Sequence, residues 1–162
     1  MDGEKEFIIL IEKNKALIYK VAGFYTDQLQ DREDLSQEIV YQLWKSVGSF
    51  RHQSNISTWI YRVAMNTAIH FLKKRKRWAT GSIREEMLEY PATDSGELEE
   101  QWKMLQAGIG GLDLLERGIV MLWLEGKSYE EISDLIGISA GNVGTRLSRI
   151  REKLKKKMTK NQ

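Results

Sequence analysis

Residues 128–154, with the sequence SYEEISDLIGISAGNVGTRLSRIREKL, decide the fold of the C-terminal half of the chain. Ile132 and Ile136 recur at helical spacing and face inward, and Ser133 is a small residue at which two helices can touch. Gly137 follows as the residue that can make a turn. This pattern predicts a helix-turn-helix, an arrangement that can place its second helix in the major groove of DNA.

The helix after this turn is expected over about Ser139 to Lys157, with Ser139 as its N-cap. One face carries an apolar stripe, which comprises Val143, Leu147, Ile150 and Leu154. The opposite side is polar and basic, and it comprises Asn142, Thr145, Arg149, Lys153 and Lys156, with Arg146 at its flank. Such a helix can pack through one side and contact bases and phosphates through the other. The alternative is an αα-hairpin that only packs.

Apolar residues upstream of this motif also recur at helical spacing. They predict helices at about Leu98–Ile109, Leu114–Leu124 and Ser128–Ile136. The first of these is broken by a cluster of glycines, which comprises Gly108, Gly110 and Gly111. The segment from about 79 to 100 holds the only proline, Pro91, among acidic and small polar residues, and this composition marks a linker.

Charge is distributed unevenly, although the formal net charge is only +2. No acidic residue occurs from Ile39 through Arg84, and the stretch from Ala140 onward has only Glu152 against many lysines and arginines. The acidic linker lies between these two basic stretches. Two basic surfaces around an acidic spacer suggest two contacts with one polyanion, and solvated helix ends are the alternative. The linker could also fold back on either basic surface and screen it from DNA.

The N-terminal part is predicted to begin with a helix from about Glu4 to Tyr25. A second helix is expected after Asp31, a suitable N-cap, with Asp34 in its first turn. At about 100° per residue, its apolar residues share one half of the helix: Leu35, Ile39, Val40, Leu43, Trp44 and Val47. The other half is polar and free to meet a partner, and it comprises Asp34, Gln37, Glu38, Tyr41 and Lys45.

A loop over 48–55 leads to a third helix of about Ser57 to Arg77. Its predicted buried stripe comprises Trp59, Ile60, Val63, Ala64, Thr67 and Phe71. A different face carries Arg62, Asn66, Lys73 and Lys76, with His70 at its edge. Amide and guanidinium groups on one helix face suit base edges and phosphates. We interpret Trp59 as a core anchor rather than a DNA intercalator.

Composition argues against an enzyme. The chain has no cysteine, which excludes disulfides and thiolate metal sites, and its two histidines, His52 and His70, are too few for a metal cluster. Its carboxylates lie mostly in the linker and the N-terminal helices, without the isolated apolar setting that raises a catalytic pKa. Gly126-Lys127-Ser128 matches the end of a phosphate-binding loop, but Met121 stands where that loop needs a glycine. We therefore expect no catalytic residues, no cofactor and no metal.

The chain shows no signal for membrane insertion or secretion. It has no run of about 18 apolar residues, and its acidic start does not match a secretory signal. These two observations predict a cytoplasmic protein.

Three blocks of sequence resemble the small two-domain bacterial sigma factors of the extracytoplasmic-function type, in that family's order. The first is Asp31 to Glu38 followed by Trp44, and the second is Ser57 to Asn66. The third comprises Arg117, Gly126 to Ile132, Gly137 to Ser139, and Arg146 to Arg149. Together the blocks cover the chain from about Phe7 to Lys155.

The resemblance implies an all-α fold of two small helical domains joined by the acidic linker. Residues 1–78 would form sigma region 2, which binds core RNA polymerase and the minus-ten promoter element. Residues 79–100 would form the linker, and residues 101–162 would form region 4, whose helix-turn-helix reads the minus-35 element. The implied function is that of an alternative sigma factor, which directs polymerase to promoters and helps to open the DNA. Polymerase itself does the chemistry.

The resemblance also assigns roles to matching residues. The residues that would face the clamp coiled coil of the polymerase beta-prime subunit are Asp34, Gln37, Glu38 and Tyr41. Those that would contact the minus-ten strand are Arg62, Asn66, His70, Lys73 and Lys74. The loop from Phe50 to Asn55, including Arg51, would hold an extruded base by stacking and hydrogen bonds. Those that would enter the minus-35 major groove are Ser139, Asn142, Thr145, Arg146 and Arg149. An anti-sigma factor is the further partner that the family implies.

The sequence departs from the family pattern at four positions. Asp113 follows Leu112 where a proline is usual, which leaves the start of that helix open. His70 stands where an acidic residue is common. Asn142 and Gly144 replace the commoner threonine and lysine, so one phosphate contact is expected to be missing.

Two other functions stay open on the residues alone. A sigma-like decoy would sequester an anti-sigma factor without touching DNA, but it would have no need of Arg62, Asn66 or the Arg146 and Arg149 stripe. A helix-turn-helix repressor would instead form a stable dimer, and it would not need the polar half of the second helix.

Overall fold

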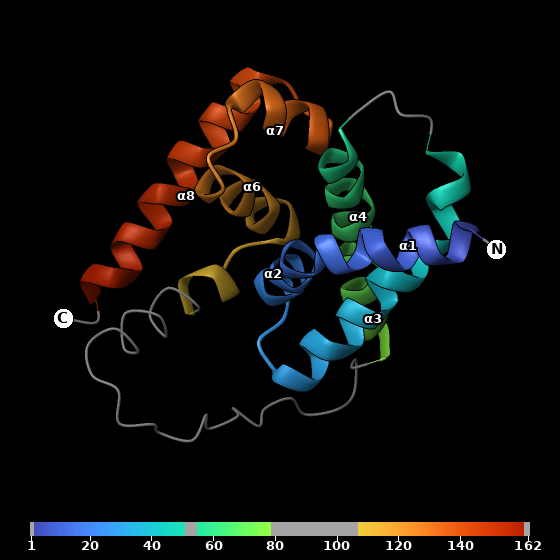
Figure 1. The fold of residues 1–162 in the computed structure, drawn as a ribbon. Coiled ribbons are helices and arrows are strands. Elements are labelled where there is room, and N and C mark those ends of the chain that lie inside the picture. Colours follow the sequence, from blue (N-terminus) through green and yellow to red (C-terminus); the bar gives the residue numbers. More distant parts are fainter. Residues whose placement is uncertain (1, 51–54, 79–106, 161–162) are drawn as a thin grey trace. The chain divides into compact units, whose positions relative to one another are not determined.

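The computed structural model describes residues 2–50, 55–78 and 107–160, and the regular elements in these ranges are all helices (Figure 1). The chain divides into two compact units, Met1–Trp78 and Ala79–Gln162. The predicted all-α fold of two small helical domains is therefore confirmed, while the linker boundaries at 79 and 100 stay a prediction. Among the helices in the described ranges, none is both long and apolar enough to cross a membrane.

The first unit is built from α1 (Asp2–Lys13), α2 (Lys15–Tyr25), α3 (Leu29–Ser46), the short 3₁₀ turn η1 (Val47–Ser49) and α4 (Ile56–Trp78). Helices α2, α3 and α4 pack against one another in pairs. On α3 the buried residues recur every four positions at Leu35, Ile39 and Leu43, which puts them on one side of the helix. They meet a buried stripe that comprises Ile18, Val21, Ala22 and Tyr25 of α2 and Ile60, Tyr61, Ala64, Met65 and Ala68 of α4.

The prediction of one helix from Glu4 to Tyr25 is wrong, because the chain breaks at Asn14. The Asn14 backbone leaves helical geometry, with φ −114° and ψ 15°. Its side-chain amide donates to the Leu10 carbonyl at 2.9 Å, in competition with the regular backbone ladder. The Asn14 carbonyl then accepts from the Ile18 N–H at 3.1 Å and starts α2.

The predicted start of α3 is also wrong. The helix begins at Leu29 after Gln28, whose side chain makes no capping hydrogen bond, and not after Asp31. Asp31 lies in the first turn instead, where a negative charge is favourable, and its carboxylate pairs with the Arg75 guanidinium of α4. Asp31 therefore ties the beginning of α3 to the end of α4.

Aromatic residues at the edge of this core are less buried than predicted. Trp44 was expected in the apolar half of α3, but 46% of it is exposed, and it packs edge-to-face on Phe7 with ring centroids 4.9 Å apart. Trp59 is half-buried, and its ring lies 5.1 Å from that of Phe50. It anchors the loop end at Phe50 to α4.

The second unit contains α6 (Leu114–Leu124), α7 (Tyr129–Ile136) and α8 (Ala140–Lys160), which pack together in pairs. Its largest fully buried side chains are Ile119, Met121, Leu122, Ile132, Leu147 and Ile150. The predicted bounds of α6 and α7 agree with the structure, and α8 extends three residues past the expected end at Lys157. The helix predicted at 98–109 lies mostly outside the described residues, which show only its last part as helical, at 107–110.

The starts of α6, α7 and α8 each have a side-chain cap. Asp113 accepts from the Glu116 N–H at 2.8 Å, and the Glu116 carboxylate accepts from the Asp113 N–H at 3.2 Å. Ser128 forms the same reciprocal capping box with Glu131 at the start of α7. The aspartate at position 113 thus starts α6 at Leu114.

The turn between α7 and α8 is the predicted one. Gly137 has φ +88°, a left-handed conformation in which a side chain is strained, and its N–H donates to the Ser133 carbonyl at 2.8 Å. The Ser133 hydroxyl donates to the Ile138 carbonyl, so the small residue predicted at the helix contact also closes the turn. Ser139 then caps α8 by accepting from the Asn142 N–H at 3.1 Å.

Candidate nucleic-acid and partner interface

A polar stripe runs along α3 on the side away from its buried leucines. Gln37 and Tyr41 are exposed and Asp34 is half-exposed, and their spacing puts them on one side of the helix. Tyr41 has 54% of its surface exposed, and the Lys45 ammonium lies 5.3 Å from the centroid of its ring. These three residues form an open surface of mixed charge and aromatic character that a partner can cover.

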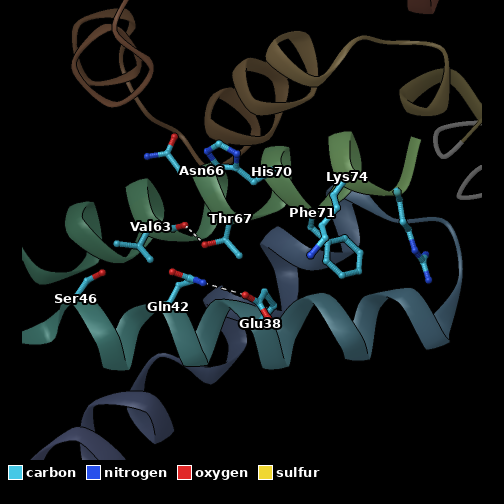
Figure 2. Close-up of a pocket in the computed structure, with 10 residues that line it drawn as sticks. Glu38, Gln42, Ser46, Val63, Asn66, Thr67, His70, Phe71 and Lys74 are labelled. Atoms are coloured by element: carbon cyan, nitrogen blue, oxygen red, sulfur yellow. Dashed lines mark hydrogen bonds between the residues drawn. The ribbon is translucent and has the colours of Figure 1, made fainter. Parts of the chain in front are cut away.

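Glu38 lies at the border of this stripe and turns toward α4. It is half-buried, and one carboxylate oxygen accepts from the side-chain amide of Gln42 at 2.9 Å (Figure 2). The sequence pattern placed Glu38 among the partner-facing residues, but it did not show that the carboxylate also lines a groove.

This groove has a volume of about 640 Å³ and runs between α3 and α4. From α3 it is lined by Glu38, Gln42 and Ser46, and from α4 by Val63, Asn66, Thr67, His70, Phe71, Lys74 and Arg75. Figure 2 shows Asn66 and His70 on the same side of α4, with Glu38 and Gln42 on the facing helix. The α4 side therefore offers amide, imidazole and ammonium groups in one row with a spacing of four residues.

The other predicted minus-ten residues lie beside this row. Arg62 and Lys73 are exposed on α4, and so is Asn55 just before it. The Asn55 carboxamide oxygen accepts from the Ser57 N–H at 3.4 Å. Phe50 is half-buried against Trp59, and Arg51 lies outside the described residues. Phe50 and Asn55 therefore mark the two ends of the predicted base-holding loop.

Arg75 behaves differently from its basic neighbours. Its guanidinium pairs with Asp31 and lies 5.3 Å from the centroid of the Phe71 ring. Helical spacing alone did not reveal this pair, because Asp31 is distant in sequence. All three cations are exposed, but Arg75 is already paired with Asp31, so Lys73 and Lys74 are the better candidates for phosphate contacts at this end of α4.

On α8, the predicted minus-35 residues form an accessible stripe. Ser139, Asn142, Thr145 and Arg149 are exposed, and Arg146 is half-exposed. The Arg146 Nε donates to the Asn142 side-chain oxygen at 3.3 Å, and this hydrogen bond orients both groups. The Thr145 hydroxyl donates to the Gly141 carbonyl at 3.1 Å.

Gly144 lies where α8 passes close to α7. A Cβ added there would come within 3.3 Å of the Tyr129 ring. The Tyr129 ring therefore gives a packing reason for glycine at position 144. The sequence alone suggested only that a phosphate contact is missing here.

Lys153 is exposed on the polar side of α8 that helical spacing predicted, but it also forms an ion pair with α6. Its ammonium hydrogen-bonds to the Glu116 carboxylate at 3.0 Å, and only 8% of the Glu116 surface is exposed. Sequence reasoning missed this pair because the residues are 37 positions apart and lie on different helices.

The pKa of Asp113 is lower than its ordinary value. Burial acts to raise the pKa, but hydrogen bonds with Glu116 and the positive charges of Arg146 and Lys153 outweigh it. The pKa of Glu131 is lowered as well, because Ser128 hydrogen-bonds to its carboxylate. Both carboxylates are therefore held in the charged form that caps their helices.

Two family models match the chain: "Sigma-70 region 2" over residues 10–90 and "Sigma-70, region 4" over residues 103–154. The ECF RNA polymerase sigma-E factor of Haemophilus influenzae is 30% identical over 96% of this chain and 88% of that protein. The RNA polymerase sigma factor SigV of Bacillus subtilis is 27% identical over 94% of this chain and 91% of that protein. The ECF RNA polymerase sigma factor SigE of Mycolicibacterium smegmatis is 27% identical over 93% of this chain, which spans 61% of that longer protein.

Solved structures that share the fold include two sigma-factor complexes. One is the sigma factor RpoE in complex with the anti-sigma factor NepR from Bartonella quintana, with a TM-score of 0.73 and 22% identity over 98% of this chain and 97% of that chain. The other is CnrH in complex with the cytosolic domain of CnrY, with a TM-score of 0.71 and 17% identity over 98% of this chain and 91% of that chain.

Proposed function

Because the chain belongs to the sigma-70 family, as a sigma factor of the extracytoplasmic-function type, we propose that it is an alternative sigma factor that binds core RNA polymerase and directs it to promoters. The observation that carries this proposal is the presence of two separate cationic helix faces. One is the exposed face of α4 that carries Arg62, Lys73 and Lys74, and the other is the stripe on α8 that carries Arg146 and Arg149. Each lies in a unit that matches a different region of the family.

We assign polymerase binding to α3. Asp34, Gln37 and Tyr41 offer an open surface to the clamp coiled coil of the beta-prime subunit, and Glu38 borders it. An exposed tyrosine beside charged and amide groups is typical of the centre of a protein interface, where an aromatic ring buries area at a low entropic cost.

We assign the minus-ten element to α4 and the loop before it. Asn66 and His70 line the groove and are placed to reach base edges, while Arg62, Lys73 and Lys74 supply positive charge for the strand backbone. Phe50, Arg51 and Asn55 supply the ring and the polar groups that an extruded base needs.

We assign the minus-35 element to the N-terminal part of α8. The Ser139, Asn142, Thr145, Arg146 and Arg149 side chains lie on an accessible face, while Val143, Leu147 and Ile150 fix the helix to its unit. Paired Arg146 and Asn142 side chains suit hydrogen bonding to base edges in a major groove.

The mechanism is recognition and strand capture. Each unit alone offers few contacts, so binding to free promoter DNA is weak and sensitive to salt, and attachment to polymerase raises the effective concentration of the second unit. No residue of the chain takes part in a reaction under this proposal. The protein acts in the cytoplasm, where polymerase works, and an anti-sigma factor regulates it by covering these faces. Residues 1–78, 79–100 and 101–162 are the proposed region 2, linker and region 4.

A pull-down with purified bacterial core RNA polymerase tests the proposal. The wild-type chain is expected to bind, and a variant that carries Asp34→Arg and Gln37→Ala is expected to lose binding. Glu12→Arg is the matched control for the charge change, because Glu12 is exposed on α1 and does not belong to the stripe. Absence of wild-type binding, or an equal loss in the control, would contradict the assignment.

A further inference from the structure

The N-terminus of α6 lies along the edge of the DNA-reading face of α8. Arg146, Arg149 and Lys153 follow one another at intervals of three and four residues, so they share one side of α8. Glu116 of α6 reaches Lys153 at 3.0 Å, and its second oxygen holds the Asp113 N–H. Arg146 lies near enough to help lower the pKa of Asp113. Two carboxylates therefore border a row of cations.

Because of where Lys153 lies, the carboxylate that pairs with it can affect DNA binding. Lys153 lies beyond the residues assigned to base reading, which end at Arg149. A free lysine there would add attraction to phosphates without reading any base, and such attraction supplies most of non-specific binding. The Lys153 side chain is 57% exposed, and its ion pair with the buried Glu116 carboxylate offsets its positive charge.

We propose that Glu116, held in place by Asp113, is a specificity-determining residue that neutralises Lys153 and so lowers binding to non-specific DNA. The inference rests on the proposed role of α8 in reading the minus-35 element. A carboxylate that weakens binding to the wrong DNA contributes to specificity as much as a contact that strengthens binding to the right DNA.

Glu116→Gln separates this role from helix capping. A glutamine oxygen can still accept from the Asp113 N–H, since glutamine also serves in capping boxes, but it cannot neutralise an ammonium. Lys153→Gln removes the cation instead. Glu130→Gln is the matched control, because Glu130 is an exposed carboxylate in the first turn of α7 and its change alters the net charge equally.

The experiment measures binding of the full chain to a random-sequence duplex by fluorescence anisotropy across a salt series. Glu116→Gln is expected to bind more tightly than wild type, with a slope of log K against log salt that is steeper by about 0.9. The ratio of its affinity to that of wild type then falls about 3.5-fold between about 50 and 200 mM salt. The double variant is expected to match wild type, because it removes both charges of the pair, whereas Lys153→Gln alone leaves the Glu116 carboxylate without its partner.

A purely structural role for Glu116 would weaken binding or leave the slope unchanged. The proposal is overturned if Glu116→Gln behaves like Glu130→Gln, or if the double variant has a shallower slope than wild type. The double variant tests the idea even where Glu116→Gln alone unfolds, which circular dichroism detects. If wild type itself shows no salt-dependent DNA binding, the inference fails, whereas the polymerase pull-down still decides the proposed function. If wild type binds and all variants share its slope, only the inference fails.

Discussion

The contact between Gly23 of α2 and Arg32 of α3 predicts a mutation whose effect on stability changes sign with its background. The Arg32 guanidinium lies 3.8 Å from the Tyr19 ring centroid, and its Nε donates to the Tyr19 carbonyl at 3.2 Å. A Cβ on Gly23 would come within 2.7 Å of the guanidinium, so Gly23→Ala must displace it. This contact holds the start of the proposed polymerase-binding helix against α2.

The magnitude follows from the interactions that are lost. The cation–π contact is worth about 0.5–1 kcal/mol at an exposed site, and the hydrogen bond about 0.5–1.5 kcal/mol. Against these losses, alanine is about 1 kcal/mol better than glycine inside a helix. In the wild-type background Gly23→Ala should therefore change stability by about 0 to −1.5 kcal/mol. In an Arg32→Ala background only the helix preference remains, and Gly23→Ala should stabilise by about 1 kcal/mol.

Native-state hydrogen exchange of the buried amides of α2 and α3 measures these free energies in the intact chain. The four proteins of the cycle should give a coupling of about 1–2.5 kcal/mol between the two positions. Additivity within about 0.3 kcal/mol, or stabilisation of equal size in both backgrounds, would refute the reasoning.

Three further predictions concern Gly137, Asp113 and Lys74. Gly137→Ala should destabilise the second unit by about 1–2 kcal/mol, because φ is +88° there, and thermal unfolding would show a lower midpoint. The pKa of Asp113 is lower in the folded chain than its ordinary value of 3.8, so its stabilising contribution is present above that value and is lost as the pH falls through the folded pKa. Asp113→Asn, which still caps, should flatten the fall in unfolding midpoint on acidification below about pH 4, and an unchanged pH profile would count against the assignment. Lys74→Ala should make the salt slope for single-stranded promoter DNA shallower by about 0.7, whereas Arg75→Ala should change it less because Asp31 already neutralises Arg75.

Much of the second unit could be predicted because its helix ends have local chemical signals. Ser128 and Ser139 each precede a helix and supply a side-chain oxygen, and Gly137 occupies a left-handed turn. Such signals act within three or four residues, so they can be read from the sequence alone. The break at Asn14 was missed, because an asparagine at a helical position gives no sign of whether its amide will turn back to the backbone.

In the candidate site, too, the features within one helix could be predicted, whereas the contacts between helices could not. Periodicity showed which side of α8 carries Arg146, Arg149 and Lys153, but it could not show what lies beside them. The Glu116 carboxylate reaches Lys153 only through the packing of α6 on α8. In the same way, Glu38 joins the groove beside α4 because α3 packs against α4, which no spacing within one helix reveals.

The most direct test of the sigma-factor account is transcription of fragmented genomic DNA by purified core polymerase with and without the full chain, followed by sequencing of the RNA 5′ ends. The account predicts a set of new start sites that appear only with the chain and share two short upstream elements at a constant spacing. Arg146→Ala together with Arg149→Ala should relax the upstream element, and Asn66→Ala should relax the downstream one. Start sites that are the same with and without the chain, or that share no upstream element, would contradict the claim that this protein selects promoters.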